Sequence, residues 1–167
     1  MLRASEELRR KAEPVWQAVE RPARPLVRVP VATCSIPAGA LETLEALRRE
    51  VAERGLGVDV GIGGGTGLCW LEPLVEVRLP GRPGVLYGNL TADKAPALIE
   101  GTLVAGGTAR ELALAVLADD SLDGVPPLRS LEFFAGQERR LMANCGVTDP
   151  EEIDHYIARG GYEGLSK

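Results

Sequence analysis

The sequence has 167 residues, a formal net charge of −5 and a pI near 5.0. The acidic balance argues against a nucleic-acid partner, and no apolar run approaches the roughly 20 residues of a membrane span. Three cysteines and the absence of an apolar stretch after Met1 favour a reducing compartment, so we expect a cytoplasmic protein.

The first 25 residues are expected to form a helix and a linker. Apolar residues recur at helical spacing over Ser5–Glu20, although Pro14 lies within that range. Pro22 and Pro25 then break the pattern. We therefore treat residues 1–25 as a separate segment ahead of the main domain.

Residues 26–105 are predicted to form one domain with the order β-α-β and then β-β-α. The first unit predicts a parallel strand pair with a right-handed crossover, and the second adds a hairpin and a closing helix. This order resembles that of thioredoxin-like domains, so the expected fold class is α/β and thioredoxin-like. The predicted elements are strands at Leu26–Ala32, Val58–Ile62, Leu74–Leu79 and Val85–Leu90, and helices at Ala38–Arg54 and from Thr91 to about Leu103.

The remaining sequence is expected to be helical. Residues 106–130 are predicted to hold a short Leu- and Ala-rich helix, Thr108–Ala118, followed by an acidic, proline-bearing linker. Residues 131–167 are predicted to hold the rest of a helix that begins at Ser130 and ends at Asn144, and a last helix over Pro150–Ala158.

Two cysteines stand at positions that suggest half of a [2Fe–2S] site. Such a cluster is held by four thiolates. Cys34 has Val29 five residues before it, where a C-x₄-C pair would begin, and Cys69 has Gly65 four residues before it, where a C-x₃-C pair would begin. We therefore interpret Cys34 and Cys69 as remnants of a cluster site and expect no metal.

The two thiols allow several interpretations. They are expected first to be small buried apolar groups, and a Cys34–Cys69 disulfide is the next possibility. A bound cluster would need ligands from a second copy or from Cys145 and His155. A thioredoxin-type thiol enzyme usually has Cys-x-x-Cys, and no cysteine occurs in the three residues after Cys34.

Three other features carry weaker signals. The glycine-rich loop Gly61–Gly67 is not expected to bind a dinucleotide. It fits no G-x-G-x-x-G register, and Pro73 argues against a helix after it. His155 is the only histidine and is expected at a solvated surface. Trp70 is expected to be buried against the former cluster site, with packing against a partner as the alternative.

Several motifs resemble the flavin-bearing, NAD-binding subunits of soluble NAD-linked formate dehydrogenases and the related subunits of complex I and bidirectional hydrogenases. Trp70-Leu71-Glu72-Pro73 is similar to the segment that follows the last cluster cysteine of their thioredoxin-like domain. The other motifs that carry the resemblance are Phe133-Phe134-x-x-Gln137-x-Arg139, Asn144-Cys145-Gly146 and Ile153-Asp154-x-Tyr156-Ile157-Ala158-Arg159-Gly160-Gly161-Tyr162.

The resemblance implies an N-terminal region of such a subunit that acts as a cofactor-free accessory domain. FMN, NAD and iron–sulfur clusters would belong to the parent complex, and the partners would be its other subunits and a flavoprotein domain. No nucleic acid and no membrane insertion are expected, and this chain alone is not expected to be catalytic. The alternative is a [2Fe–2S] electron-transfer domain with an incomplete or intermolecular ligand set.

Overall fold

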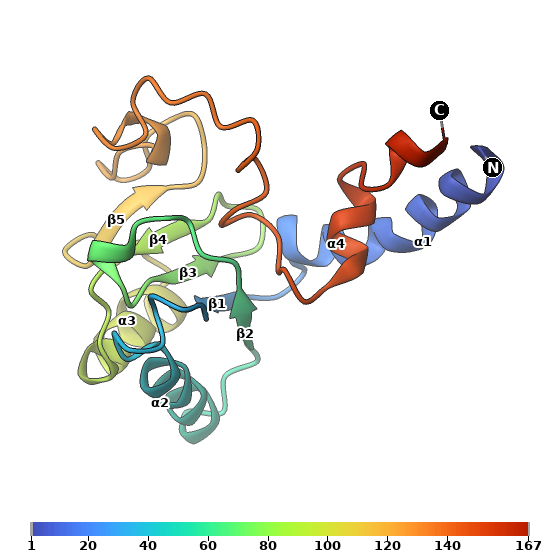
Figure 1. The fold of residues 1–167 in the computed structure, drawn as a ribbon. Helices are drawn as coiled ribbons and strands as arrows, with labels where there is room; N and C mark the ends of the chain where they lie inside the picture. The colour runs from blue at the N-terminus through green and yellow to red at the C-terminus, as the bar shows by residue number, and fades with distance from the viewer. Residues whose placement is uncertain (1, 167) are drawn as a thin grey trace.

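A five-stranded mixed sheet forms the centre of the computed structural model, which describes residues 2–166 (Figure 1). The strand order is β2-β1-β3-β4-β5. β1 and β2 are parallel, with Pro30 opposite Gly63, and every other neighbouring pair is antiparallel. The strands are β1 (Leu26–Pro30), β2 (Asp59–Gly63), β3 (Val75–Arg78), β4 (Val85–Tyr87) and β5 (Ala113–Val116).

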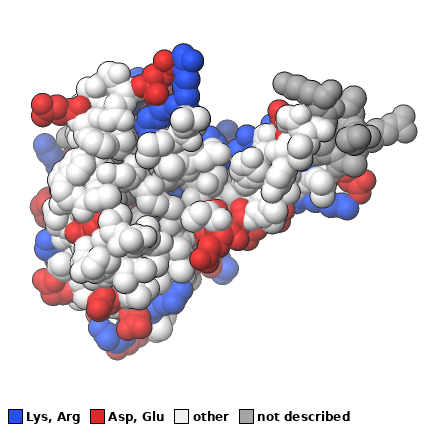
Figure 2. All heavy atoms as spheres, viewed as in Figure 1, with Lys and Arg blue, Asp and Glu red and all other residues white. Residues whose placement is uncertain are grey.

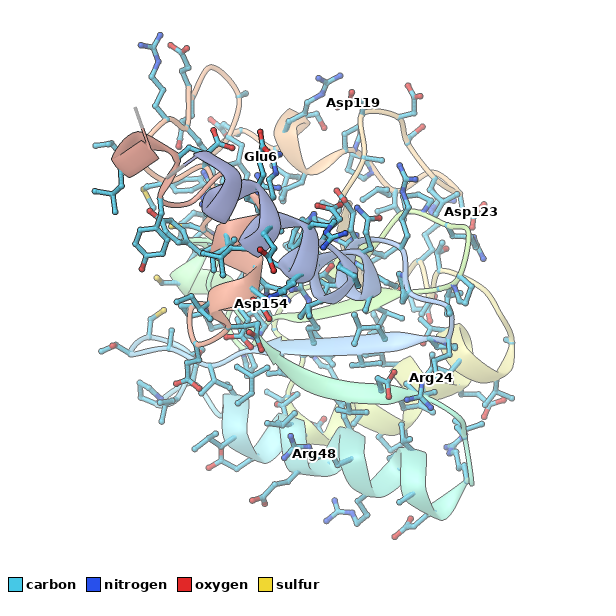
Figure 3. The ribbon with its side chains drawn as sticks, turned by 90° about the vertical axis from the view of Figure 1, so that its right-hand side faces the viewer. Glu6, Arg24, Arg48, Asp119, Asp123 and Asp154 are labelled. Carbon is cyan, nitrogen blue, oxygen red and sulfur yellow. The ribbon has the colours of Figure 1, made fainter. Side chains whose placement is uncertain are left out.

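Two helices cover one face of this sheet and enclose the main core. α2 (Ala40–Glu53) and α3 (Ala95–Ile99) pack against each other and lie below the strands in Figure 1. Leu44, Leu47 and Val51 of α2 are buried, whereas Leu41 is exposed, as is Arg48, which is labelled in Figure 3. The helical spacing of apolar residues therefore sets which face of α2 enters the core.

The topology confirms the predicted fold class. α2 connects the parallel strands β1 and β2, and the antiparallel strands β3 and β4 lead into α3. This β-α-β and then β-β-α order is that of a thioredoxin-like fold. α3 continues without a break into a wider π-helical turn at Glu100–Val104.

The N-terminal helix packs against the last helix in a lobe beside the sheet (Figure 1). α1 (Leu2–Glu20) is continuous through Pro14, and α4 covers Ile153–Ala158. Trp16 is 6% exposed, with its ring edge-on to His155 at 5.6 Å, and the Arg159 guanidinium lies 5.1 Å from the centre of the Trp16 ring. Sequence ends that lie far apart in the chain are thus neighbours in space.

The predicted helix over Thr108–Ala118 is wrong, because β5 lies within this range. β5 extends the sheet beyond β4, with Val116 opposite Val85 and Ala115 opposite Leu86. Leucine and alanine favour helices only weakly, by a fraction of a kcal/mol per residue. Pairing with β4 and burial of Ala115 and Val116 decide the structure instead.

The predicted helix over Ser130–Asn144 is also wrong. A short 3₁₀ helix, Leu128–Ser130, is followed by a chain of turns that runs to residue 152. Gly136 has a φ of +80°, which interrupts any helix. Leu141 is fully exposed, whereas Phe134 is buried. α4 begins at Ile153, three residues later than predicted.

Charged side chains of both signs gather at the margins of the larger lobe, and its middle is mostly uncharged on the face shown in Figure 2. Within residues 2–166, no helix has the length and apolar character to cross a bilayer.

Candidate functional site

Cys34 lies in a tight turn between the end of β1 and the start of α2. The buried Ser35 hydroxyl accepts a hydrogen bond from the Ala32 amide at 2.7 Å and donates one to the Ala32 carbonyl at 3.1 Å. The Ala40 amide then donates to the Ser35 carbonyl at 3.0 Å. These bonds fix the turn, and the Cys34 side chain remains half-buried.

Cys69 begins a three-residue 3₁₀ helix, η1 (Cys69–Leu71), that follows β2 and its glycine-rich loop. The Leu71 carbonyl accepts a hydrogen bond from the Asn89 amide at 2.7 Å, and the Pro73 carbonyl accepts one from the Leu90 amide at 2.9 Å. The chain just after β4 therefore holds this segment in place. Cys69 itself is exposed.

The two cysteine segments lie side by side because β1 and β2 are parallel. Their carboxyl ends meet, with the Val31 amide donating to the Gly63 carbonyl at 3.4 Å. The segments cross the same end of the sheet in Figure 1, one in light blue and one in green. Cys69 is the main group that raises the pKa of Cys34. The expectation that both thiols are buried is wrong, since both reach the surface, and both are free cysteines in this structure.

A buried carboxyl group completes this site. Glu72 is 8% exposed, forms a cis peptide bond with Pro73, and accepts a hydrogen bond from the Leu74 amide at 2.8 Å. Burial raises the pKa of Glu72, and the Leu74 hydrogen bond acts against that rise. Glu72 stands out in the sequence, but the sequence does not show that it is buried.

The hydrogen bond with Cys69 is the main cause that raises the pKa of Cys34. Burial and then the negative charges of Cys69 and Glu72 act in the same direction. Cys34 is therefore held in its neutral thiol form, whereas a thioredoxin-type nucleophile needs a lowered pKa. The site is a pair of thiols near a carboxyl group, and it has no Cys-x-x-Cys motif.

The residues at this site do not fit a four-thiolate cluster within one copy of the chain. Gly65 supplies no donor atom, and Val29 is fully buried in the main core. Among residues 2–166, no three His, Cys, Asp or Glu side chains are grouped so that they could hold a metal. Cys34 and Cys69 are thus brought together, but two thiols remain half of the set that a [2Fe–2S] cluster requires.

Close packing against residues 144–148 explains why the glycine-rich loop has no side chain at Gly64. A Cβ on Gly64 would clash with the Thr148 carbonyl oxygen, and a Cβ on Gly146 would lie 2.6 Å from the Thr66 side chain. Arg139 ties the two segments, donating to the carbonyls of Thr66 at 3.3 Å and Cys145 at 3.2 Å. Residues 144–148 therefore pack directly against the glycine-rich loop.

An exposed aromatic groove borders the thiol pair. The prediction that Trp70 is buried is wrong, since it is 58% exposed and packs edge-on against Phe133 at 4.7 Å. The reason is its place in η1, where it follows the exposed Cys69 and projects from the surface. The groove, of about 410 Å³, is lined by Leu68, Trp70, Leu71, Leu114, Leu131, Glu132 and Phe133.

The prediction of a solvated His155 is wrong as well. His155 is 5% exposed, and its Nδ1 accepts a hydrogen bond from the Asp149 amide at 3.1 Å. Burial lowers its pKa. Packing of α4 against Trp16 on α1 causes this burial, and no local signal in residues 150–158 reveals it.

No family model matches the chain. Two solved structures of a thioredoxin-like [2Fe–2S] ferredoxin from Aquifex aeolicus align with it at TM-scores of 0.49 and 0.48. The first is 19% identical and covers 62% of this chain and 96% of the ferredoxin. The second is 18% identical and covers 55% and 97%.

Two curated proteins from Solidesulfovibrio fructosivorans are similar in sequence. NADP-reducing hydrogenase subunit HndC is 61% identical over 31 residues, which are 19% of this chain and 6% of HndC. NADP-reducing hydrogenase subunit HndB is 34% identical over 100 residues, which are 59% of this chain and 79% of HndB. Because most of HndB is covered at this identity, the chain belongs to the family of NADP-reducing hydrogenase subunit HndB.

Proposed function

We propose that this chain is an accessory part of a multi-subunit oxidoreductase, one that holds no cluster itself and contacts subunits that carry electrons to a nicotinamide cofactor. Its membership in the HndB family is the observation that carries the proposal, because HndB is named as a subunit of an NADP-reducing hydrogenase. The short match to HndC, a second subunit of that enzyme, supports the same assignment.

The finer assignment is to the flavin-bearing, NAD-binding subunits of NAD-linked formate dehydrogenases. It rests on the motifs after Cys69 and at residues 133–162 that resemble those subunits. FMN, NAD and the iron–sulfur clusters then belong to the parent complex, which works in the cytoplasm. This chain contributes contacts and no catalytic step.

We infer that a partner subunit covers the groove beside Trp70. Trp70 and Phe133 are 58% and 40% exposed and pack edge-on against each other. Exposed tryptophans of this kind supply much of the binding energy at protein interfaces. The occupant that suits the groove is an apolar side chain of the flavin-bearing partner.

Purification of the tagged chain from its native host tests the accessory role. We expect it to co-purify with a flavin- and iron-bearing subunit that reduces or oxidises a nicotinamide cofactor. Trp70→Ala should lower the yield of that partner at least several-fold, whereas Leu141→Ala, a control at a fully exposed leucine, should not. Recovery of the chain alone under gentle conditions would contradict the accessory role.

Iron analysis of the isolated chain decides between this function and the electron-carrying alternative. We expect the chain to stay colourless and free of iron after anaerobic reconstitution with iron and sulfide. A visible chromophore with about two iron atoms per cluster, lost in Cys69→Ser, would instead establish a [2Fe–2S] carrier. Size-exclusion chromatography of a reconstituted sample would show whether two copies share that cluster.

A further inference from the structure

We propose that Cys34 and Cys69 form a thiol–disulfide exchange site that reacts with low-molecular-weight disulfides, such as oxidised glutathione, and closes to an internal disulfide. The proposal concerns the chain by itself and does not depend on the accessory role. It follows from the way the fold brings two segments side by side, each with a free cysteine that reaches the surface.

The backbones on both sides of the thiol pair are in close contact. Before the cysteines, a Cβ on Gly65 would lie 3.9 Å from the Ala32 Cβ, and after them a Cβ on Gly39 would lie 3.9 Å from Pro73 Cγ. These contacts bracket the two cysteines. A disulfide needs a sulfur–sulfur separation of about 2.05 Å, and the side-by-side course of the two segments brings their cysteines to the same end of the sheet.

The surroundings keep this geometry in place. Ser35 fixes the Cys34 turn through two hydrogen bonds to Ala32. Asn89 and Leu90 fix the η1 segment through bonds to the carbonyls of Leu71 and Pro73. The two cysteines thus belong to two anchored segments.

Exposure sets the order of the two steps. Cys69 is the exposed thiol, so its thiolate attacks one sulfur of the small disulfide and releases one small thiolate, which takes up a proton. Cys34 then loses its proton to solvent and attacks the Cys69 sulfur, which releases the second small thiol. The balance is two protein thiols and one disulfide giving one protein disulfide and two small thiols.

The mixed disulfide also makes Cys34 a better nucleophile. In the reduced protein, the hydrogen bond with Cys69 is the main cause of the raised pKa of Cys34. Once Cys69 is bonded to the small thiol, it can no longer carry a negative charge or hold the Cys34 proton. Burial and Glu72 remain as the opposing causes.

The closed bond would join the turn before α2 to the segment that carries Trp70. Cys145 lies in a different segment, is half-buried, and is not among the groups that raise the pKa of Cys34. The internal disulfide should therefore form between Cys34 and Cys69 alone. It should also raise the Tm, since it constrains the unfolded chain between the two positions.

Mass spectrometry of the full chain in a glutathione redox buffer tests the proposal. We expect the reduced protein to lose the mass of two hydrogens, to show a Cys34–Cys69 linked peptide after digestion, and to melt several degrees higher. Dithiothreitol should restore the reduced mass and the original Tm. A chain that keeps its thiols, or that bonds Cys145 instead, overturns the proposal.

Three single variants, checked for folding by circular dichroism, separate the steps. Cys145→Ser should still close the internal bond. Cys34→Ser should accumulate one glutathione on Cys69, because the resolving thiol is missing. Cys69→Ser should react much more slowly at Cys34, which is half-buried. Equal glutathione uptake by Cys34→Ser and Cys69→Ser would overturn the assigned order and with it the proposed site.

Discussion

The guanidinium group of Arg28 donates a hydrogen bond at 3.2 Å to the carbonyl oxygen of Val147, which lies 119 positions later in the chain. The same guanidinium forms a buried ion pair with Glu76 at 2.5 Å, and Glu76 also pairs with Arg78. A strand of the central sheet is thereby joined to the segment that leads into α4. The buried charges thus connect the sheet to the α1–α4 lobe.

Replacing Arg28 with methionine should therefore destabilise the protein strongly. The change leaves Glu76 buried at 5% exposure with Arg78 as its remaining partner, and breaking a buried pair typically costs about 3–5 kcal/mol. We expect Arg28→Met to lower the free energy of unfolding in urea by about 3 kcal/mol. Protease cleavage within residues 140–160 should also become faster.

Arg24→Met is the matched control for that variant. Arg24 pairs with Asp59 at 2.7 Å near the ends of β1 and β2, and both side chains are largely exposed (Figure 3). Exposed pairs contribute about 0–1 kcal/mol, so this variant should stay within that range of the wild type. Equal losses for the two arginine variants would contradict the role given to Arg28.

The glycine-rich loop offers a second prediction. Gly64→Ala places a methyl group against the Thr148 carbonyl oxygen, so one of the two backbones must shift. We expect a loss of about 1–3 kcal/mol in urea denaturation, the usual cost of overpacking. Gly61→Ala is the control, because nothing lies within 4 Å of the added methyl. A loss for Gly61→Ala as large as that for Gly64→Ala would rule out close packing as the cause.

The sequence predicts the thioredoxin-like core well because its signals are local and agree with one another. Residues 40–53 place apolar residues at helical spacing, and residues 75–79 alternate, so period and element coincide. The parallel β1–β2 pair then brings the Cys34 and Cys69 segments together, as their positions after these strands predict. The adjacency of the thiols therefore follows from topology.

The parts that the sequence does not predict depend on distant contacts. β5 is a strand because β4 offers it an open edge, although its Leu and Ala residues favour a helix. Distant contacts also explain why Trp70, expected to be buried, is exposed and why His155, expected to be exposed, is buried. η1 lies at the surface, whereas α4 is covered by α1. The local sequence around Trp70 and His155 predicts neither arrangement.

The buried histidine predicts that the protein loses stability in mild acid. The pKa of His155 is lowered by burial first and by Arg28 as well, while Glu152, Asp149 and Asp154 oppose the shift. A lowered folded-state pKa gives stability that is present above the unfolded value, about 6.5, and is lost as the pH falls through the folded value. Protonation also removes the Nδ1 acceptor used by the Asp149 amide.

His155→Gln should remove this pH dependence, because a glutamine oxygen can accept the same hydrogen bond without titrating. Urea midpoints of the wild type and the variant would be compared at pH 7.5 and pH 5. We expect the wild type to lose more stability than the variant between these values. Parallel losses in both proteins would show that other groups control the acid response.

The buried carboxyl group of Glu72 predicts a pH dependence of stability opposite in sign to that of His155. Burial raises the pKa of Glu72, so its stabilising contribution is complete below the unfolded value, about 4.3, and is lost as the pH rises through the folded value. Glu72→Gln keeps an acceptor for the Leu74 amide and removes the charge. The variant should be more stable than the wild type at pH 7, and the difference should shrink toward zero below pH 4. Glu45→Gln, on the exposed face of α2, should change stability little at either pH.

Because the Glu72 charge also raises the pKa of Cys34, Glu72→Gln should make Cys34 react faster with iodoacetamide at pH 7. An unchanged alkylation rate together with unchanged stability would mean that Glu72 reaches solvent and does not act on the thiol pair.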